Sequence, residues 1–190
     1  GSSFDLRLGY QKTWLNRLGG ELLLTGQIGS TMGAGVDLYQ PLEPTQTFFA
    51  ESLASYFRTL SPIYQDNQKL AEYRVKAGTI DIAAGVNVGL LGQVRAGWQQ
   101  KNVDYSLETG LPFFPTGNVS YGGYFAGLDF DQFDRLYFPS RGWSTNLRYF
   151  STNDPDYSRL DAELKGAYPF GRYVLSGELY YGGSPRGTLP

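Results

Sequence analysis

A strict alternation of side chains over residues 157–170 constrains the fold of this chain more than any other feature. On a strand, successive side chains point to opposite faces, so the pattern separates charged from apolar residues. On a helix the same charges would fall on opposite sides of the cylinder, and no apolar stripe would form. The charged positions are Arg159, Asp161, Glu163 and Lys165, and they alternate with Leu160, Ala162, Leu164, Gly166, Tyr168 and Phe170. The run is therefore predicted to be a strand with one polar and one apolar face.

The same period of two recurs along most of the chain. Further runs lie at 5–11, 21–28, 32–38, 94–99 and 173–181, and about ten strands are expected in total, with few helical candidates. Strands that follow one another through turns favour an all-β, antiparallel, up-and-down sheet.

The run at 69–89 shifts its phase near Gly78. A bulge at Gly78 could restore the facing. Alternatively, the first half of this run rises above a bilayer, where alternation is no longer enforced. We favour the second interpretation.

Composition favours a transmembrane barrel over a soluble sheet. Aromatic residues make up 16% of the 190 residues, yet the mean hydropathy is only -0.32. A soluble domain with so many aromatics normally has a more apolar average. In a barrel, one face of each strand contacts lipid and the other lines a wet lumen, which explains both values. As a soluble β-sandwich, the chain would expose an unusually large apolar surface.

Aromatic residues also gather near one set of turns, where they would form a girdle at the periplasmic membrane interface. They are Trp14, Tyr39, Phe48, Phe49, Tyr137, Phe138, Trp143, Tyr168, Phe170 and Tyr173. Connections of this set are expected to be short, whereas those at 61–69, 103–118 and 151–156 are expected to be mostly longer and polar, as in outer-membrane barrels.

Several function classes are excluded by composition. The chain has no cysteine and no histidine, which rules out disulfides, thiolate zinc sites and Ser-His-Asp catalysis within it. A net charge of -2 argues against nucleic-acid binding. No apolar run is long enough for a transmembrane helix. The N-terminus shows no signal peptide, so an outer-membrane protein would have lost its signal or carried it upstream. No cofactor or metal is expected.

The stretch 130–143 carries a compact motif, Asp-x-x-Asp-x-x-x-Phe-Pro-x-x-Gly, formed by Asp131, Asp134, Phe138, Pro139 and Gly142. Paired carboxylates suggest metal binding or acid/base catalysis, but no third ligand is evident and histidine is absent. A structural role is the stronger hypothesis. The aspartates would accept backbone N–H groups around a turn, the Phe-Pro pair would fix chain direction, and the glycine would supply a conformation that other residues resist.

This motif resembles a signature of the bacterial surface-antigen barrels, which include outer-membrane protein assembly factors and two-partner-secretion translocators. Residues 12–21 and 37–42 are similar to the turn after the second strand and the end of the fourth strand in that superfamily. The resemblance implies that residues 1–190 form a single partial outer-membrane domain, from about strand two to about strand eleven of a sixteen-stranded barrel. Residues 13–16 and 38–42 are most similar to the barrels that follow patatin-like phospholipase domains.

Two departures from the superfamily pattern imply a piece of a larger protein. Arg186-Gly187 is followed by Thr188, where the superfamily has an aromatic residue on a loop folded into the lumen. The chain also ends at Pro190 and not on an aromatic-terminated strand.

The expected function is a non-catalytic translocator or anchor domain in the bacterial outer membrane. Expected partners are membrane lipid and an upstream passenger or periplasmic domains of the same protein, with a second copy as a further candidate. The alternatives are the barrel of a patatin-like phospholipase whose hydrolase lies upstream, or a passive porin or soluble binding module. Arg159, Asp161, Glu163, Lys165 and Glu178 are expected to face the lumen, and Leu160, Ala162, Leu164, Tyr168, Leu175 and Leu179 to face lipid.

Overall fold

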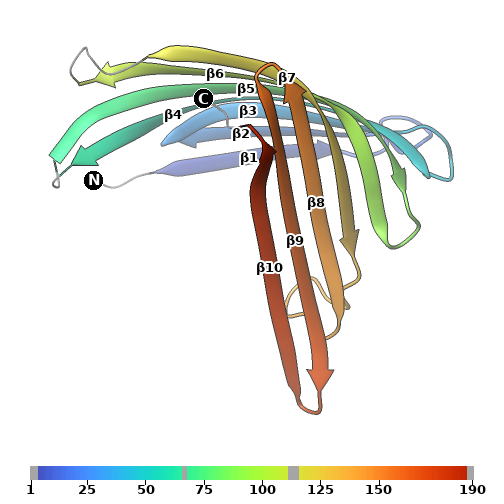
Figure 1. The fold of residues 1–190 in the computed structure, drawn as a ribbon. Coiled ribbons are helices and arrows are strands. Elements are labelled where there is room, and N and C mark those ends of the chain that lie inside the picture. The colour runs from blue at the N-terminus through green and yellow to red at the C-terminus, as the bar shows by residue number, and fades with distance from the viewer. Residues whose placement is uncertain (1–3, 66–67, 111–115, 188–190) are drawn as a thin grey trace. The chain divides into compact units, whose positions relative to one another are not determined.

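A computed structural model of the chain describes residues 4–65, 68–110 and 116–187, and its described part consists of ten strands joined by turns (Figure 1). Hydrogen-bonded neighbours follow chain order from first to last in one antiparallel sheet. The strands are β1 (Asp5–Lys12), β2 (Glu21–Gly29), β3 (Thr31–Pro41), β4 (Phe48–Gln65), β5 (Gln68–Asn87), β6 (Gly92–Thr109), β7 (Gly117–Asp131), β8 (Gly142–Asn153), β9 (Asp156–Phe170) and β10 (Tyr173–Arg186). The predicted all-β, up-and-down fold is confirmed.

Among these residues we find no helix of the length and apolarity that a membrane crossing requires. The chain divides into two compact units, each of which is described by itself. The first comprises Gly1–Gln40, Glu51–Ile82 and Gln99–Gly122, and the second comprises Pro41–Ala50, Ala83–Trp98 and Gly123–Pro190.

In the first unit, β1, β2 and β3 pair in a register that sorts polar from apolar side chains. Leu24 stands opposite Tyr10 on one side and Val36 on the other, so these three share an apolar face. Gln27 stands opposite Arg7, on the other face. Since facing alternates along each strand, the period-2 pattern of the sequence is realised here as two distinct surfaces.

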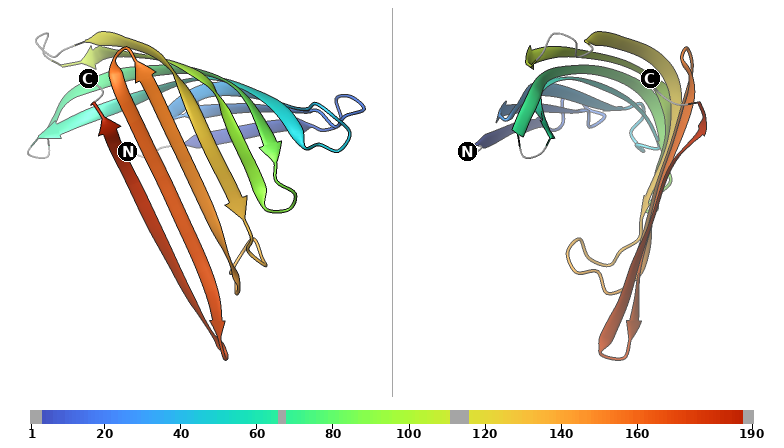
Figure 2. Two further views of the ribbon diagram at one scale, coloured as in Figure 1. Left: turned by 45° about the vertical axis from the view of Figure 1, so that its right-hand side comes forward. Right: turned by 60° about the vertical axis from the view of Figure 1, so that its left-hand side comes forward.

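In the second unit, β8, β9 and β10 run side by side (Figure 2). Leu164 stands opposite Thr145 of β8 and Leu179 of β10. Lys165, one residue along, stands opposite Ser144 and Glu178. Along β9, the pairing with β8 and the pairing with β10 both run without a register shift from Ala167 to Leu160. The two faces therefore stay separate over most of β9.

The predicted difference in connection length is wrong. The connections at 61–69, 103–118 and 151–156 were expected to be the longer ones. Yet β8 and β9 are separated only by Asp154 and Pro155, and β4 ends at Gln65 just before β5 begins at Gln68. The longest connection, residues 132–141, belongs to the set that was expected to be short. Polar residues at 61–65 and 103–109 had suggested loops, but the strands continue through them; residues 66–67 and 111–115 of these stretches lie outside the described residues.

Large aromatic side chains pack onto glycines of neighbouring strands, and two of these aromatics, Phe49 and Phe150, are buried. A Cβ on Gly85 would lie 2.3 Å from the ring of Phe49, which is fully buried. Phe57 covers Gly33 at the same distance, and the ring of Phe150 lies 2.7 Å from a Cβ on Gly123. Glycine within a strand often marks such a close approach. The prediction that Phe49 belongs to an outward aromatic girdle is therefore wrong.

Candidate functional site

One face of β8, β9 and β10 collects the charged residues that the sequence predicted to face a lumen. Glu178 lies directly across from Lys165, and Arg159, Asp161, Glu163 and Lys165 occupy alternate positions of β9 on the same side. The opposite face carries the predicted lipid-facing set, since Leu179 pairs with Leu164 and Leu175 with Tyr168. The structure thus sorts these residues into the two expected groups. Which group meets lipid and which meets water stays a prediction.

The charges on this polar face neutralise one another. Arg159 donates from Nε to both carboxylate oxygens of Asp161, at 3.0 and 2.7 Å, and from Nη2 at 2.8 Å. The Lys165 ammonium lies 3.0 Å from Glu163 and 3.8 Å from Glu178. Tyr180 donates its hydroxyl to Asp161 at 3.2 Å. These pairs are partly exposed, so each contributes little to stability, and their main effect is a wall of mixed sign.

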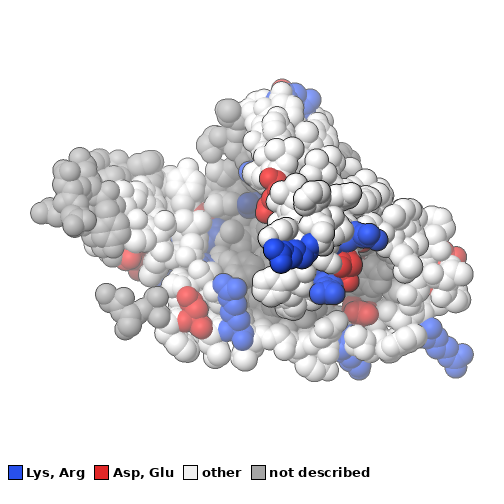
Figure 3. Space-filling model, turned by 90° about the horizontal axis from the view of Figure 1, so that it is seen from below, with Lys and Arg blue, Asp and Glu red and all other residues white. Residues whose placement is uncertain are grey.

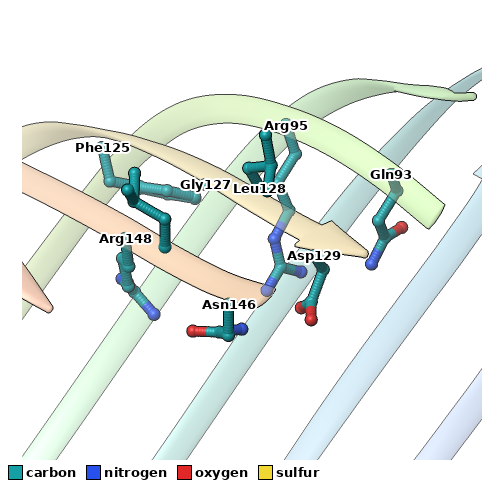
Figure 4. A pocket seen from close by; sticks show the side chains of 9 residues that line it. Gln93, Arg95, Phe125, Gly127, Leu128, Asp129, Asn146 and Arg148 are labelled. Carbon is teal, nitrogen blue, oxygen red and sulfur yellow. The ribbon is translucent and has the colours of Figure 1, made fainter. Parts of the chain in front are cut away.

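A small pocket lies on the same polar side at β6, β7 and β8 (Figure 4). Gln93, Arg95, Asp129, Asn146 and Arg148 project from one side of the sheet around it. The cavity is about 110 Å³, whereas pockets that enclose a small-molecule ligand usually measure ~300–1,000 Å³. The pocket is accordingly a recess in a polar wall, with no room for an enclosed substrate.

Sequence reasoning missed an aromatic layer on this polar face. Phe125 stands opposite Phe150, and both are buried. Tyr157 lies 6.4 Å from Phe150 between ring centroids, and the guanidinium of Arg148 stacks 4.9 Å above the Phe125 ring. These aromatics break the alternation of polar and apolar residues, and a sequence signal exists only for Phe150, which packs on Gly123 of the neighbouring strand.

Arg186 is the last residue of β10, and Thr188, the departure from the superfamily pattern, lies outside the described residues. The Nε of Arg186 lies 2.7 Å from Asp156, and its Nη2 donates to Ser151 Oγ at 3.1 Å and to the carbonyl of Thr152 at 3.2 Å. Arg186 thereby links the end of β10 to both strands that flank the β8–β9 turn.

The acidic motif surrounds the 132–141 connection. Asp131 accepts the backbone N–H of Phe133 at 2.9 Å, and Asp134 accepts those of Ser140 at 2.9 Å and Arg141 at 3.1 Å. Gly142 has φ of +119°, a conformation that side-chain-bearing residues rarely adopt. A Cβ there would lie 2.1 Å from the carbonyl oxygen of Gln132.

The same connection is tied to the neighbouring turn between β5 and β6. The side-chain amide of Gln132 donates to the carbonyls of Leu90 at 2.8 Å and Leu91 at 3.3 Å. Phe138, at φ of +53°, projects from the loop with 92% of its surface exposed. A left-handed conformation costs a bulky residue about 1–2 kcal/mol, so the surrounding hydrogen bonds must hold the loop in place. Asp131 and Asp134 therefore act within a network of backbone contacts.

Hydrogen bonds lower the pKa of Asp134 from 3.8 to about 2, first from the Ser140 hydroxyl and then from the Arg141 backbone N–H. Because the folded state favours the carboxylate, its stabilising contribution is fully present above pH 3.8 and is lost as pH falls through about 2. We expect the amide resonances of Ser140 and Arg141 to titrate with a midpoint near 2. Asp134→Asn should abolish that titration, and a midpoint at the ordinary aspartate value would contradict the hydrogen-bonded geometry.

Acidic and basic side chains are intermixed on the surface seen in Figure 3, and neither sign forms a continuous patch there. Within residues 4–65, 68–110 and 116–187, no group of three or more acidic residues is arranged to hold a metal ion. Strands β8, β9 and β10 thus present one apolar face and one polar face, and acidic and basic side chains are paired on the polar face.

No family model and no curated protein matches this chain. A solved structure does: the crystal structure of BamA from Haemophilus ducreyi lacking POTRA domains 1–3 aligns with a TM-score of 0.73 at 15% identity. The alignment covers 95% of this chain and 38% of that one, so the present sequence spans well under half of the matched protein. At this identity the likeness concerns the fold. This likeness gives no support to the narrower resemblance to barrels that follow patatin-like phospholipase domains.

Proposed function

We propose that this chain forms part of an outer-membrane β-barrel of the assembly and translocator kind, with a lipid-facing outer surface and a wet, charge-neutral inner wall. The fold that it shares with BamA supports this proposal, as does the acidic Phe-Pro motif. The barrel itself would bind and position its polypeptide passenger or anchor it, and would catalyse no reaction.

The observation that carries the proposal is the apolar face of β8, β9 and β10. Tyr149 and Tyr181 stand at one end of it, and Tyr168 and Phe170 at the other. Between Leu160 and Phe170 the even positions of β9 hold no charged residue. These ten steps span roughly 33 Å along a strand at ~3.3 Å per residue. At a tilt of about 40° that is roughly 25 Å of height, the thickness of the apolar band in outer-membrane barrels.

The longer strands support the same placement of the bilayer. β5 has 20 residues and β6 has 18, whereas crossing the membrane takes only ~9–11. Beyond the apolar part of these strands, Arg74 pairs with Glu108, and Lys76 lies 3.9 Å from Asp104. Ion pairs outside the lipid would accord with the phase shift near Gly78, with the first half of β5 rising above the bilayer.

Closure of the barrel requires further strands. Within the described residues β1 and β10 each pair with a single neighbour, and an open sheet edge is not tolerated in lipid. We infer that additional strands, of a longer chain or of another copy, complete a barrel of sixteen. An upstream hydrolase of the patatin type stays an alternative for the parent protein, without an observation in this fold that favours it.

Epitope tags inserted at opposite turns test the proposal in cells. A tag after Pro155, in the β8–β9 turn, should be labelled by antibody on intact cells. A tag after Gly171, in the β9–β10 turn, should be labelled only after the outer membrane is permeabilised, because one strand separates the two turns. Detection of both tags on the same side, or recovery of the tagged protein in the soluble fraction, would contradict a transmembrane β9.

A further inference from the structure

We propose that a groove on the apolar face of the first unit binds one acyl chain of a phospholipid, with the head group held at β6. The inference rests on the proposed function, since this face would have to contact the membrane. It adds a specific lipid site to a surface that otherwise meets lipid without preference.

The groove crosses five neighbouring strands, from Gln100 and Asn102 on β6 to Leu24 on β2. Four strand spacings of ~4.8 Å give a length of roughly 19 Å, which suits an extended fatty acyl chain. Its floor contains the small residues Gly78 and Ala54. A Cβ on Gly78 would meet only the Tyr56 ring, at 4.0 Å, so the space above this glycine is open.

Large apolar side chains border the floor. Tyr56 is 52% exposed, Ile80 is 48% exposed and Val36 is 38% exposed. Such side chains around a floor of small residues make a channel in which an acyl chain gains contacts on several sides. A flat lipid-facing surface offers contact on only one side, so a chain in the groove gains additional van der Waals contacts.

Polarity changes along the groove in the order that an amphiphile requires. At the β6 end stand two amides, and Gln100 donates its Nε2 to Ser120 Oγ at 3.0 Å. Immediately beyond them, Lys76 pairs with Asp104. The opposite end is formed by Leu24 and Val36. Amides and a balanced ion pair suit a zwitterionic head group, so phosphatidylethanolamine is the ligand class that fits best.

Photo-crosslinking locates the bound chain. The full chain is reconstituted in phosphatidylethanolamine vesicles that contain a probe lipid with a diazirine on its acyl chain, and labelled peptides are mapped by mass spectrometry. We expect labelling to concentrate on the segments around Ala54 and Gly78. Filling the groove with Ala54→Leu and Gly78→Val removes these packing contacts and should lower this labelling about tenfold.

Ala162→Leu is the matched control, because Ala162 is also half-exposed and lies on the corresponding face of β9. It should leave groove labelling unchanged. Tyr56→Ala removes a wall without adding bulk, so it keeps the test decisive if the filled variant folds poorly, and it should lower labelling severalfold. Equal labelling in wild type and variants, or labelling spread evenly over the apolar face, would overturn the lipid site alone. Absence of labelling anywhere on that face would overturn the proposed function as well.

Discussion

Replacing Leu164 with arginine is expected to block membrane insertion of this protein. Leu164 lies in the middle of the apolar face of β9, with Thr145 and Leu179 as its cross-strand neighbours. A cation at the bilayer midplane costs about 2–4 kcal/mol on the lipid face of a barrel, and far less on a wall exposed to water. Heat modifiability after reconstitution, read as a shift in electrophoretic mobility, measures the folded fraction.

Glu163→Arg is the matched control, since it introduces the same side chain one residue away. Glu163 lies on the polar face, where Lys165 also contacts Glu178. Replacing Glu163 should therefore lower the stability of the folded protein by no more than an exposed ion pair contributes, ~1 kcal/mol or less. If Leu164→Arg inserts normally and Glu163→Arg fails, the assignment of the two faces is reversed.

Gly85→Val is expected to destabilise the fold through a steric clash. A Cβ at Gly85 would lie 2.3 Å from the ring of Phe49 and 2.7 Å from the backbone oxygen of Val94, and the backbone oxygen has little freedom to move. Overpacking of this kind usually costs about 1–3 kcal/mol, and displacing the fully buried Phe49 would add to that. The urea concentration at the unfolding midpoint should fall.

Gly177→Val provides the comparison, because a Cβ at Gly177 meets no atom within 4 Å. Gly177 pairs with Gly166 on the apolar face, where added apolar volume would point into lipid. We expect its unfolding midpoint to match the wild type or exceed it. Equal loss of stability in both variants would contradict the steric explanation. It would show that both sites need glycine for its backbone conformation, and not to leave space for an aromatic ring.

The separation of the two faces could be predicted from sequence because it depends only on local alternation. In β9 the pattern from Arg159 to Lys165 specifies both faces, and the pairing of Glu178 with Lys165 extends them to the next strand. The acidic motif could be placed in a turn for a similar reason, since Asp134 contacts residues only six and seven positions away.

Features that depend on cross-strand register were not predictable in this way. Phe49 approaches Gly85, which is far away in sequence, so nothing local distinguishes it from the exposed Phe48. The prediction of connection lengths was wrong for a related reason. Polar side chains at the C-terminal end of β6 resemble a loop in composition, yet the strand continues because the neighbouring strands are hydrogen-bonded to it.

Spin-label accessibility along β9 tests the central claim most directly. The chain has no cysteine, so single cysteine substitutions from Leu160 to Lys165 each give one labelled site in the reconstituted protein. Labels at even positions should collide preferentially with oxygen, which partitions into lipid, and labels at odd positions with a water-soluble nickel chelate. An alternation with a period of two in this phase is the predicted result. The opposite phase, or equal access to the nickel chelate at all six positions, would contradict a lipid-facing apolar surface on β9.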